Sequence, residues 1–334
     1  MKKPKILVVG SFVMDQIART SIFPKEGETV LGNTFAKAPG GKGANQAVQM
    51  ARLGADVTMI GKVGHDANGD EMVRTCREAG IHTDDMLYGG ENEMSGCSVI
   101  ILEEHPGEQT KNRIIVLPGT NHTIRRDEVE FLKEKIADYD LLVLQLEIPM
   151  EINEQVAAYA YEKGVPVMLN SAPSAPLSDE LLSHLSFISP NEHEAANMVG
   201  ITIHHDPENA RKVNMDDAKA ACAALKAKGV KNVLITLGEA GAVLDTEKSG
   251  FYYSPCAENI QAVDPTAAGD SFVGAFCVGI TCGWNYEDIL KFANHTAALT
   301  VSALGAMPSL PDLDKAEAFC RERCGIDPDT SMLR

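Results

Sequence analysis

A short run of small residues that ends in an aspartate has the composition of a phosphoryl-transfer site. The run is Asp264-Pro-Thr-Ala-Ala-Gly-Asp270, and an apolar helical pattern follows it directly. Small residues let the backbone approach a ligand, and a helix start presents unpaired N–H groups and the positive end of its dipole. Ala267, Ala268 and Gly269 are therefore a candidate anion hole. Asp270 is a candidate base beside it, or else an ordinary acidic residue that the dipole stabilises.

A second cluster, Pro39-Gly-Gly-Lys-Gly-Ala-Asn45, is rich in glycine but differs from a phosphate-binding P-loop. Gly43 stands where that motif requires Ser or Thr after the lysine. The dinucleotide-binding fingerprint is also missing, because the first predicted strand is followed by Gly10-Ser-Phe-Val-Met-Asp15. We therefore expect the backbone N–H groups of the second cluster to bind neutral polar oxygens, with the Asn45 amide adding a contact.

Two more clusters follow predicted strands. In Ser189-Pro-Asn-Glu-His-Glu194, Asn191 and Glu194 could hold a Mg²⁺ ion through water. The same two residues could instead cap the following helix, which is the commoner use of this pattern. In Thr236-Leu-Gly-Glu-Ala-Gly241, the glycines would let a flat base or phosphate groups approach the backbone.

The composition is that of a protein with a substantial core, because 44% of the 334 residues are hydrophobic. The formal net charge of −17 argues against a general nucleic-acid-binding protein and against binding to an anionic membrane surface. The eight cysteines are scattered without a CxxC pair, which suits a reducing cytoplasm. The first apolar run, at residues 5–10, is too short for a signal peptide or a membrane span.

Apolar runs typical of buried strands alternate with helical patterns along the chain. The predicted strands are Ile6–Val9, Val57–Ile60, Leu141–Leu146, Val165–Leu169, Phe187–Ser189 and Val233–Leu237. The predicted helices cover about 43–53, 68–79, 126–137, 150–163, 192–199 and 215–228. This alternation predicts an α/β fold, a mostly parallel central sheet with helices on both faces.

Two stretches, residues 13–38 and about 95–118, interrupt the alternation and look extended. They contain the apolar runs Thr29–Leu31, Cys97–Leu102 and Arg113–Leu117, with a turn-rich segment at 103–107. We expect a small antiparallel sheet outside the main one, which acts as a lid that excludes water or only covers an edge of the core. Since no repeat or long linker is present, residues 1–334 are expected to form a single domain.

Taken in order, the clusters resemble those of the ribokinase-like carbohydrate kinase family, from Ile6 to beyond Pro311. The shared motifs are Gly-Gly-Lys-Gly-Ala-Asn-Gln at 40–46, Gln-Leu-Glu at 145–147, Leu-Asn-x-Ala-Pro at 169–173, Pro-Asn-Glu-x-Glu at 190–194, Ile-Thr-Leu-Gly at 235–238, Ala-Ala-Gly-Asp at 267–270 and Gly-Ala-x-Pro-Ser at 305–309. The resemblance implies an enzyme that phosphorylates a sugar with ATP. The expected reaction is transfer to the 5-hydroxyl of a pentose, D-ribose giving ribose 5-phosphate.

The resemblance also assigns roles at the sugar. Asp270 would be the base that accepts the proton of the hydroxyl, and Ala267, Ala268 and Gly269 would form the anion hole. This agrees with the demands of phosphoryl transfer, which needs positioning and charge stabilisation more than covalent chemistry. The positions matched to sugar binding are Val13, Asp15, Gly41, Lys42, Gly43, Asn45, Glu147 and Asp270.

The other matched positions would bind the nucleotide, Mg²⁺ and a monovalent cation, usually K⁺. The nucleotide positions are Asn191, Thr236, Leu237, Gly238, Glu239, Gly241, Gly269 and Asn294. The monovalent-cation positions are Asp264, Thr266, Thr300, Ala303, Gly305 and Ser309, several of them through backbone carbonyls. Glu194 would order the Mg²⁺ environment. Asp264 could also be only a turn residue before Pro265.

The chain departs from the family pattern at a few positions. Val13 stands where Asn is usual in the segment that holds the sugar, and Val cannot bond a hydroxyl. The substrate could therefore lack that hydroxyl, as 2-deoxyribose does, or another residue could compensate. Asn294 replaces a frequent His, Ser171 replaces a common Pro, and Pro265 replaces a residue such as Thr or Ile in the cation loop.

Several functions stay open at this stage. Within the family they are a ribose kinase, a 2-deoxyribose kinase, and another sugar or nucleoside kinase. Outside it, a dinucleotide oxidoreductase would need the missing glycine fingerprint, and a non-catalytic sugar-sensing protein would be expected to lose Asp270. The expected partners are the sugar and ATP, with no nucleic acid and no membrane. Ribokinase-like kinases often form homodimers through the lid, and an exposed lid edge would favour such pairing.

Overall fold

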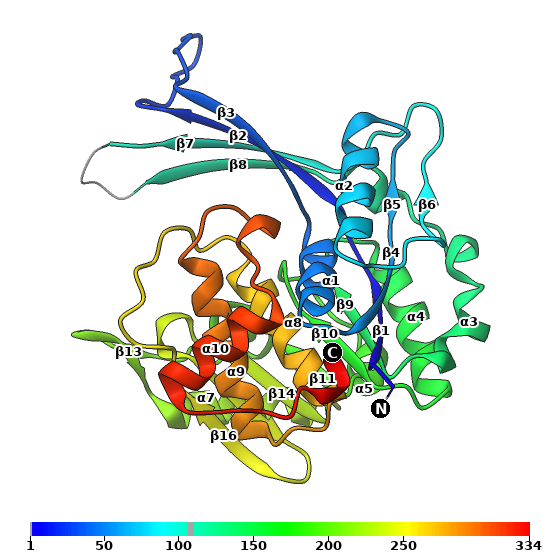
Figure 1. Cartoon of the computed structure of the whole chain (residues 1–334), viewed down its shortest axis with the longest axis vertical. Coiled ribbons are helices and arrows are strands. Elements are labelled where there is room, and N and C mark those ends of the chain that lie inside the picture. Colours follow the sequence, from blue (N-terminus) through cyan, green and yellow to red (C-terminus); the bar gives the residue numbers. More distant parts are fainter. Residues whose placement is uncertain (1, 106–109) are drawn as a thin grey trace.

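An eight-stranded sheet forms the centre of the computed structural model, which describes residues 2–105 and 110–334. Its strand order is β16-β15-β14-β11-β10-β9-β1-β4 (Figure 1). The strands are β1 (Lys5–Val9), β4 (Asp56–Ile60), β9 (Leu141–Gln145), β10 (Val167–Asn170), β11 (Phe187–Ser189), β14 (Asn232–Thr236), β15 (Ala242–Thr246) and β16 (Gly250–Ser254). The pairings from β4 to β14 are all parallel, and β14–β15 and β15–β16 add an antiparallel edge.

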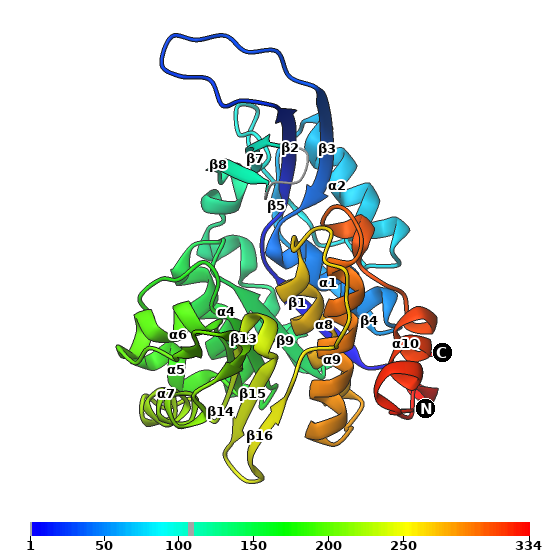
Figure 2. The same ribbon diagram turned by 90° about the vertical axis from the view of Figure 1, so that its left-hand side faces the viewer.

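Helices cover both faces of this sheet (Figures 1 and 2). One face carries α1 (Lys42–Arg52), α2 (Ala67–Glu78), α8 (Ala268–Thr281), α9 (Tyr286–Val301) and α10 (Leu313–Cys324). The other carries α3 (Leu132–Lys135), α4 (Met150–Glu162), α5 (Asp179–His184), α6 (Glu192–Val199) and α7 (Met215–Ala227). No helix in the described parts of the chain combines the length and apolarity needed to cross a bilayer.

Burial on both faces explains why the central strands read as unbroken apolar runs. In β1, Ile6 and Val8 belong to the core beneath α1 and α8. Leu7 and Val9, which alternate with them, belong to the core beneath α4. The predicted mostly parallel sheet with helices on both faces is confirmed.

The predicted and observed elements differ in a few places. The predicted helix at 126–137 is wrong, because two 3₁₀ turns (Arg126–Val129 and Ile136–Asp138) flank the single turn of α3. The Glu128 carboxylate there accepts from the Arg125 backbone N–H and from the buried Lys62 ammonium group, which holds the first turn tight. Strands with no counterpart among the predictions are β5 (Lys62–Val63), β6 (Leu87–Tyr88), β12 (His205–Asp206), β13 (Asn209–Val213), β15 and β16.

A separate four-stranded sheet, called the small sheet below, projects from the body of the molecule (Figures 1 and 2). Its order is β3-β2-β7-β8, and its strands are β2 (Val13–Thr20), β3 (Thr34–Gly40), β7 (Cys97–Glu103) and β8 (Lys111–Leu117). The two outer pairings are antiparallel, as predicted, whereas the central β2–β7 pairing, which joins the two hairpins, is parallel. Thr29–Leu31 lie in the connection between β2 and β3, not in a strand. Pro106 and Gly107 of the predicted turn lie outside the described residues.

Two glycines that follow helices on the same face of the main sheet differ in their surroundings. Gly54 follows α1 with a φ of 95°, and a Cβ there would lie 2.2 Å from the carbonyl oxygen of Leu333. Gly80 follows α2 with a φ of 84°, and nothing lies within 4 Å of the corresponding Cβ position. Both positions favour glycine by their backbone angles, but only Gly54 also makes room for the C-terminal segment.

We predict that Gly54→Ala destabilises the protein more than Gly80→Ala. The left-handed backbone costs an alanine roughly 1–2 kcal/mol at either position. Only Gly54→Ala must also displace the backbone at Leu333. Urea unfolding of the two variants measures the difference, and equal losses of unfolding free energy would contradict the close approach.

Candidate active site

Several predicted site residues meet at the carboxyl ends of the parallel strands, where open α/β sheets bind their ligands. A cavity of about 220 Å³ lies there. Its lining residues are Lys42, Asn170, Ala172, Ser189, Asn191, Glu194, Thr236, Pro265, Ala267, Gly269, Asp270 and Val273. They come from α1, from the ends of β10, β11 and β14, from the loop after β10, from the start of α6, and from the first turns of α8 with the loop before it. Segments far apart in the sequence therefore meet around one cavity.

Asp270 lies in the first turn of α8 and is only 7% exposed. Asn45 Nδ2 donates to its Oδ2 at 2.9 Å, and Gln46 Nε2 donates to its Oδ1 at 2.9 Å. Burial raises the pKa of the Asp270 carboxyl, while Lys42 and the two amide donors oppose the rise. The oxygen of the Asn45 amide, Oδ1, is buried without a partner among the described residues. A buried carboxylate that two donors align and that is more basic than usual suits a general base.

The loop before α8 leaves backbone N–H groups free. Ala267 has a φ of 62°, in the left-handed region, and precedes the first helical residue. The Ala268 N–H donates to the Pro265 carbonyl at 3.2 Å. The N–H groups of Gly269 and Asp270 have no acceptor among the residues described, so they can bind a phosphoryl oxygen. Ala268 thus uses its N–H inside the loop, and Gly269 can offer its own to a ligand.

Glu147, just after β9, ties the start of α1 to the end of β1. Its carboxylate accepts from the Lys42 backbone N–H at 2.9 Å and from the Ser11 hydroxyl. The Ser11 oxygen in turn accepts from the Gly43 N–H at 3.3 Å. A Cβ at Gly43 would lie 2.6 Å from the Ser11 nitrogen, so only glycine lets α1 begin this close to β1.

Asp15 and Val13 lie on the same face of β2, because successive strand residues alternate. Met14 between them is fully buried in the core. Ser98 of β7 donates its hydroxyl proton to Asp15 Oδ1, and burial raises the pKa of the Asp15 carboxyl against this bond. Gly41 has a φ of 94°, and a Cβ there would lie 2.8 Å from the Val13 nitrogen. The glycine-rich segment therefore packs directly on the start of β2.

Lys42 is the only basic side chain among the residues that line the described cavity. Burial by itself would lower the pKa of its ammonium group, but Asp270, Glu147 and Glu194 outweigh burial and raise it. Lys42 is therefore charged at neutral pH. It places one fixed positive charge among three carboxylates, beside the free N–H groups of the α8 loop.

Asn191 and Glu194 form a reciprocal cap at the start of α6. Asn191 Oδ1 accepts from the Glu194 N–H at 2.8 Å, and Glu194 Oε2 accepts from the Asn191 N–H at 2.8 Å. Burial raises the pKa of the Glu194 carboxyl, while the Asn191 N–H and the Lys42 charge oppose the rise. The capping interpretation is thus confirmed, yet both residues also line the cavity. The second carboxylate oxygen of Glu194 remains available to a ligand.

The segment after β14 turns sharply beside the cavity. Thr236 lines the cavity, and Gly238 and Glu239 are exposed in the turn. Leu237 is fully buried in the core, so only its backbone can face a ligand. Gly241 has a φ of 102°, which suits glycine.

Asn294 of α9 supports the loop that follows β16. Its Nδ2 donates to the carbonyl oxygens of Ser254 at 3.0 Å and Pro255 at 3.2 Å. A Cβ at Gly241 would lie 2.1 Å from the same Ser254 oxygen, so Asn294 and Gly241 contact one loop from two sides. Asn294 does not line the described cavity. Asn294 instead stabilises the Ser254–Pro255 loop, which packs against the turn after Thr236.

Asp264 joins two loops near the start of α8. Its Oδ1 accepts from the Thr266 N–H at 2.9 Å and from the Thr266 hydroxyl at 2.6 Å, and its Oδ2 accepts from the Gly305 N–H at 3.0 Å. Burial opposes ionisation, but these hydrogen bonds outweigh it and lower the pKa of the Asp264 carboxyl. Asp264 is therefore an ionised group that fixes both loops.

The hydroxyl groups of two other predicted cation positions, Thr300 and Ser309, donate to groups other than Asp264. The Thr300 hydroxyl donates to Ser271 Oγ at 2.7 Å, and the Ser309 hydroxyl donates to the Ala306 carbonyl at 2.8 Å. The Ala303 N–H donates to the Thr300 carbonyl at 3.1 Å. A cation beside Asp264 would therefore meet mainly backbone carbonyls from these positions.

Comparison with known proteins identifies the family of this chain. Residues 3–313 match the model of the pfkB family carbohydrate kinases. The chain belongs to this ribokinase-like family. Its relatives include a ribokinase of Schizosaccharomyces pombe, 40% identical over 92% of this chain and 95% of that protein. A Bacillus subtilis ribokinase is 36% identical over 93% of this chain and 98% of that protein.

Solved structures agree with the sequence relatives. The Arabidopsis thaliana ribokinase complexed with ribose and ATP superposes with a TM-score of 0.85 at 32% identity, covering 96% of this chain and 99% of that chain. A Thermotoga maritima ribokinase gives a TM-score of 0.82 at 30% identity, covering 95% and 99%. The prediction of an ATP-dependent sugar kinase of the ribokinase-like family is confirmed.

Five polar residues that hold the site together are absent from the predicted site of this kinase. Three of them, Gln46, Gln145 and Asn170, lie inside the quoted family motifs, so a signal was present without a role attached to it. Ser11 and Ser98 carry no sequence signal, because their contacts depend on α1 reaching the end of β1 and on β2 pairing with β7.

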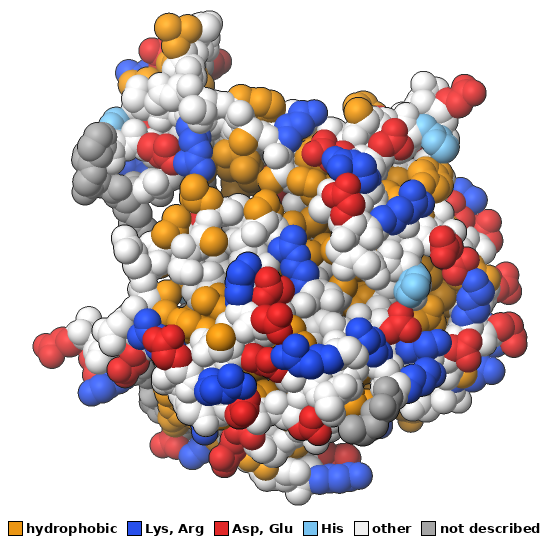
Figure 3. All heavy atoms as spheres, viewed as in Figure 1, with side chains coloured by type: hydrophobic (Ala, Val, Ile, Leu, Met, Phe, Trp, Pro, Cys, Tyr) orange, Lys and Arg blue, Asp and Glu red, His pale blue; other side chains and the backbone are white. Residues whose placement is uncertain are grey.

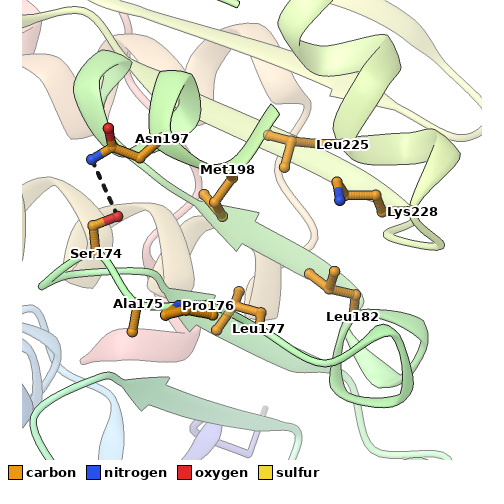
Figure 4. A pocket seen from close by; sticks show the side chains of 9 residues that line it. All are labelled: Ser174, Ala175, Pro176, Leu177, Leu182, Asn197, Met198, Leu225 and Lys228. Carbon is orange, nitrogen blue, oxygen red and sulfur yellow. Dashed lines mark hydrogen bonds between the residues drawn. The ribbon is translucent and has the colours of Figure 1, made fainter. Parts of the chain in front are cut away.

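A larger cavity of about 490 Å³ lies away from these residues, between α5, α6, α7 and the loop before α5 (Figure 4). Leu182, Met198 and Leu225 give it an apolar wall, and Lys228 is its one charged residue. Among its described lining residues, Asn197 Nδ2 donates to Ser174 Oγ at 3.4 Å, and the Lys228 N–H donates to the Leu225 carbonyl at 3.1 Å. The size of a cavity alone therefore does not locate the site of this kinase.

We predict that Asp270→Asn lowers kcat for sugar phosphorylation by roughly 10²–10⁴-fold, the usual loss when a positioned general base is removed. ATP binding should be largely retained, because the amide keeps the shape of the carboxyl group. Coupled ADP release measures kcat, equilibrium dialysis measures ATP binding, and thermal unfolding checks the fold. A variant with more than about a tenth of the wild-type kcat would exclude Asp270 as the base.

Proposed function

We propose that this kinase transfers the γ-phosphoryl group of ATP to the 5-hydroxyl of D-ribose. The observation that carries the proposal is the buried Asp270 carboxylate, which Asn45 and Gln46 align beside the free N–H of Gly269. The relatives described as ribokinases, and the plant ribokinase complexed with ribose and ATP, support ribose as the sugar.

In the proposed reaction, an Asp270 oxygen takes the proton of the sugar hydroxyl as that hydroxyl oxygen bonds to the γ-phosphorus. The bond between the γ-phosphorus and the bridging oxygen breaks, and ADP leaves. The Gly269 N–H and the Lys42 ammonium group would stabilise the charge on the moving phosphoryl group. Asp15 and Glu147 would hold the sugar, because one carboxylate can accept bonds from two hydroxyls.

The nucleotide would lie along the Thr236 turn, with Asn294 supporting the adjoining wall. Mg²⁺ usually keeps several waters and binds one or two carboxylates together with substrate phosphates. Glu194, with one free carboxylate oxygen at the cavity, fits that habit. No group of three potential ligands among His, Cys, Asp and Glu occurs in the described parts of the chain, so phosphate oxygens and water would complete the Mg²⁺ shell.

A monovalent cation such as K⁺ would fit beside Asp264. One carboxylate together with neutral carbonyl and hydroxyl oxygens suits a weakly charged ion, and Asp264 already joins the loops that carry Thr266 and Gly305. Such an ion would keep the loop before α8 in the shape that leaves the Gly269 N–H free.

We therefore predict that K⁺ increases kcat more than Na⁺ does. Coupled ADP release in K⁺, Na⁺ and a bulky organic cation at matched ionic strength measures the effect. Asp264→Asn should reduce the difference between the salts, because the amide weakens the ion's one charged contact. Equal rates in all three salts would rule out the cation site.

The small sheet would serve as the lid, with residues 1–334 acting as one kinase domain. Its outer strand β8 is exposed along its length, and several large hydrophobic side chains of this region are about half exposed or more. They are Leu31, Phe35, Ile114, Ile115, Val116 and Leu117. An exposed apolar edge of this kind favours pairing with a second copy, so we include a homodimer through the lid in the proposal.

The surface charge fits small-molecule substrates. On the face drawn in Figure 3, basic side chains are interspersed with acidic ones, without a continuous basic area. All eight cysteines are free thiols, and a cytoplasmic location belongs to the proposal because such thiols persist in a reducing compartment.

The experiment that tests the function is a coupled ADP-release assay over a panel of sugars. Ribose should give the highest kcat/KM, ahead of 2-deoxyribose, hexoses and nucleosides. A 2-deoxyribose kinase is the second candidate, because Val13 shares the face of β2 that carries Asp15 and cannot bond a hydroxyl. A higher kcat/KM for 2-deoxyribose would replace the first candidate by the second.

We predict that Val13→Asn shifts the kcat/KM ratio toward ribose. A site that bonds a substrate hydroxyl rejects the analogue that lacks it, because buried polar groups are then left unpaired. An apolar residue discriminates less, by a difference on the order of 1–3 kcal/mol. Ile17→Asn, farther along the same face of β2, serves as the control. Residue 13 does not face the sugar if two results coincide: the wild type does not phosphorylate 2-deoxyribose, and Val13→Asn leaves the kcat/KM ratio unchanged.

A further inference from the structure

A chain of amides, two of them fully buried, links the ends of three parallel strands to Asp270. Gln145, the last residue of β9, donates from Nε2 to Gln46 Oε1 at 2.7 Å. Gln46 of α1 donates from Nε2 to Asp270 Oδ1 at 2.9 Å and to Asn170 Oδ1 at 3.1 Å. Asn170, the last residue of β10, donates from Nδ2 to the Ser189 carbonyl at 2.8 Å. Gln46 and Gln145 are fully buried.

The direction of every bond in this chain follows from its two ends. The Ser189 carbonyl can only accept, so the nitrogen of the Asn170 amide must face it and the Asn170 oxygen must face Gln46. Gln46 must then present its nitrogen to Asn170, which is the same nitrogen that an ionised Asp270 requires. The Gln46 oxygen is left to face Gln145, whose nitrogen donates to it. The Ser189 carbonyl and the ionised Asp270 carboxylate therefore each require the same orientation of the Gln46 amide.

We propose that Gln46 and Gln145 are positioning residues that hold the Asp270 carboxylate in one orientation for proton transfer. Gln46 donates directly to the base. Gln145 acts through Gln46, because its amide nitrogen donates to Gln46 Oε1 and so holds that oxygen away from the Asp270 carboxylate. A turned amide would direct its oxygen at the carboxylate and repel it. The inference rests on the proposed function, since it concerns the group that takes the proton.

The surroundings leave little freedom for the two glutamines. The amide oxygen of Gln145, Oε1, is buried without a partner among the described residues. A Cβ at Gly10 would lie 2.1 Å from this oxygen, so the glycine after β1 gives the Gln145 amide its space. An unpaired buried oxygen costs free energy, and it is tolerated here because the same amide's nitrogen orients Gln46.

The chain also affects how readily Asp270 holds a proton. Donors to a carboxylate favour its ionised form, so Gln46 counteracts the effect of burial on the pKa of the Asp270 carboxyl. The charged groups that face Asp270 are Lys42 of α1 and Glu147 after β9, and both stay in place when the glutamines are replaced. Loss of the Gln46 donor should therefore raise the pKa of the base and move the acid limb of the kcat profile to higher pH.

The test uses Gln46→Met, Gln145→Met and the double variant, since methionine keeps the side-chain length and removes the amide. Gln46→Met should lower kcat by roughly 10-fold or more, as expected for a lost hydrogen bond to a charged group, with an acid limb at higher pH and an unchanged KM for ATP. Gln145→Met should have the same signature with a smaller loss. The double variant should be no worse than Gln46→Met alone, because Gln145 acts only through Gln46.

The matched control is Gln155→Met. Gln155 is also buried, but it lies on α4 and bonds the Arg126 carbonyl and the Tyr159 hydroxyl, away from the site. The Gln155→Met variant should keep the wild-type pH profile of kcat. Thermal unfolding of all variants checks that they fold. A wild-type acid limb in both Gln46→Met and Gln145→Met, or losses that add in the double variant, would overturn the proposal.

A readout without turnover separates this inference from the proposed function. In protein with ¹³C-labelled aspartate carboxyls, the Asp270 signal, assigned by its absence in Asp270→Asn, reports the pKa of the base directly. An upward shift of this pKa in Gln46→Met would support the chain even if ribose proved not to be the substrate. An unchanged pKa would refute it even if ribose were phosphorylated.

Discussion

The contact between α1 and α8 is the interaction on which the active site depends. Helix α1 carries Lys42, Asn45 and Gln46, and α8 carries Asp270. The two helices can approach closely because Gly274 of α8 has no side chain. A Cβ there would lie 2.8 Å from side-chain carbons of Gln49 on α1. At that separation short amide side chains reach the carboxylate directly, without water between them. A wider spacing would leave Asp270 buried without donors, which is a costly state for a charged group.

The site also resolves an electrostatic conflict. A chain with a formal charge of −17 has to bind a nucleotide anion among carboxylates of its own. Burial raises the pKa of Asp15, Glu194 and Asp270, so each of them is less readily ionised than in water. One lysine and the N–H groups at the start of α8 supply the local positive field. Few positive groups are enough because they are placed where charge develops during the transfer.

The parallel sheet brings these parts to one edge. Strands β10, β11 and β14 end at residues that line the cavity. The parallel strands β9 and β1 end at the same edge of the sheet, and β1 leads from there into β2 of the small sheet. The candidate lid is therefore connected directly to the edge that carries the site. Glycines at 41 and 43 allow this crowding, since side chains there would collide with the backbone after β1.

The sequence by itself was sufficient for the fold class, the order of the main elements and the positions of the four clusters. Apolar periodicity reports burial on both faces of a strand, and glycines and caps mark where elements end. The prediction of a helix at 126–137 failed, because the hydrogen bond from the Lys62 ammonium group to the Glu128 carboxylate joins residues far apart in the chain. Prediction from the sequence also missed the antiparallel edge β15–β16, whose short strands carry a weak pattern.

Only the tertiary structure decided how the site residues act on one another. Asp270 and Gln46 are 224 positions apart, and no local pattern states that an amide of one helix meets a carboxylate of another. The sequence pattern at Asn191 and Glu194 allowed a helix cap, the commoner use, or a metal-binding group. The structure shows a cap that also lines the cavity. Residue types and spacing describe what a side chain can do, whereas burial, direction and partners depend on the packing of elements distant in sequence.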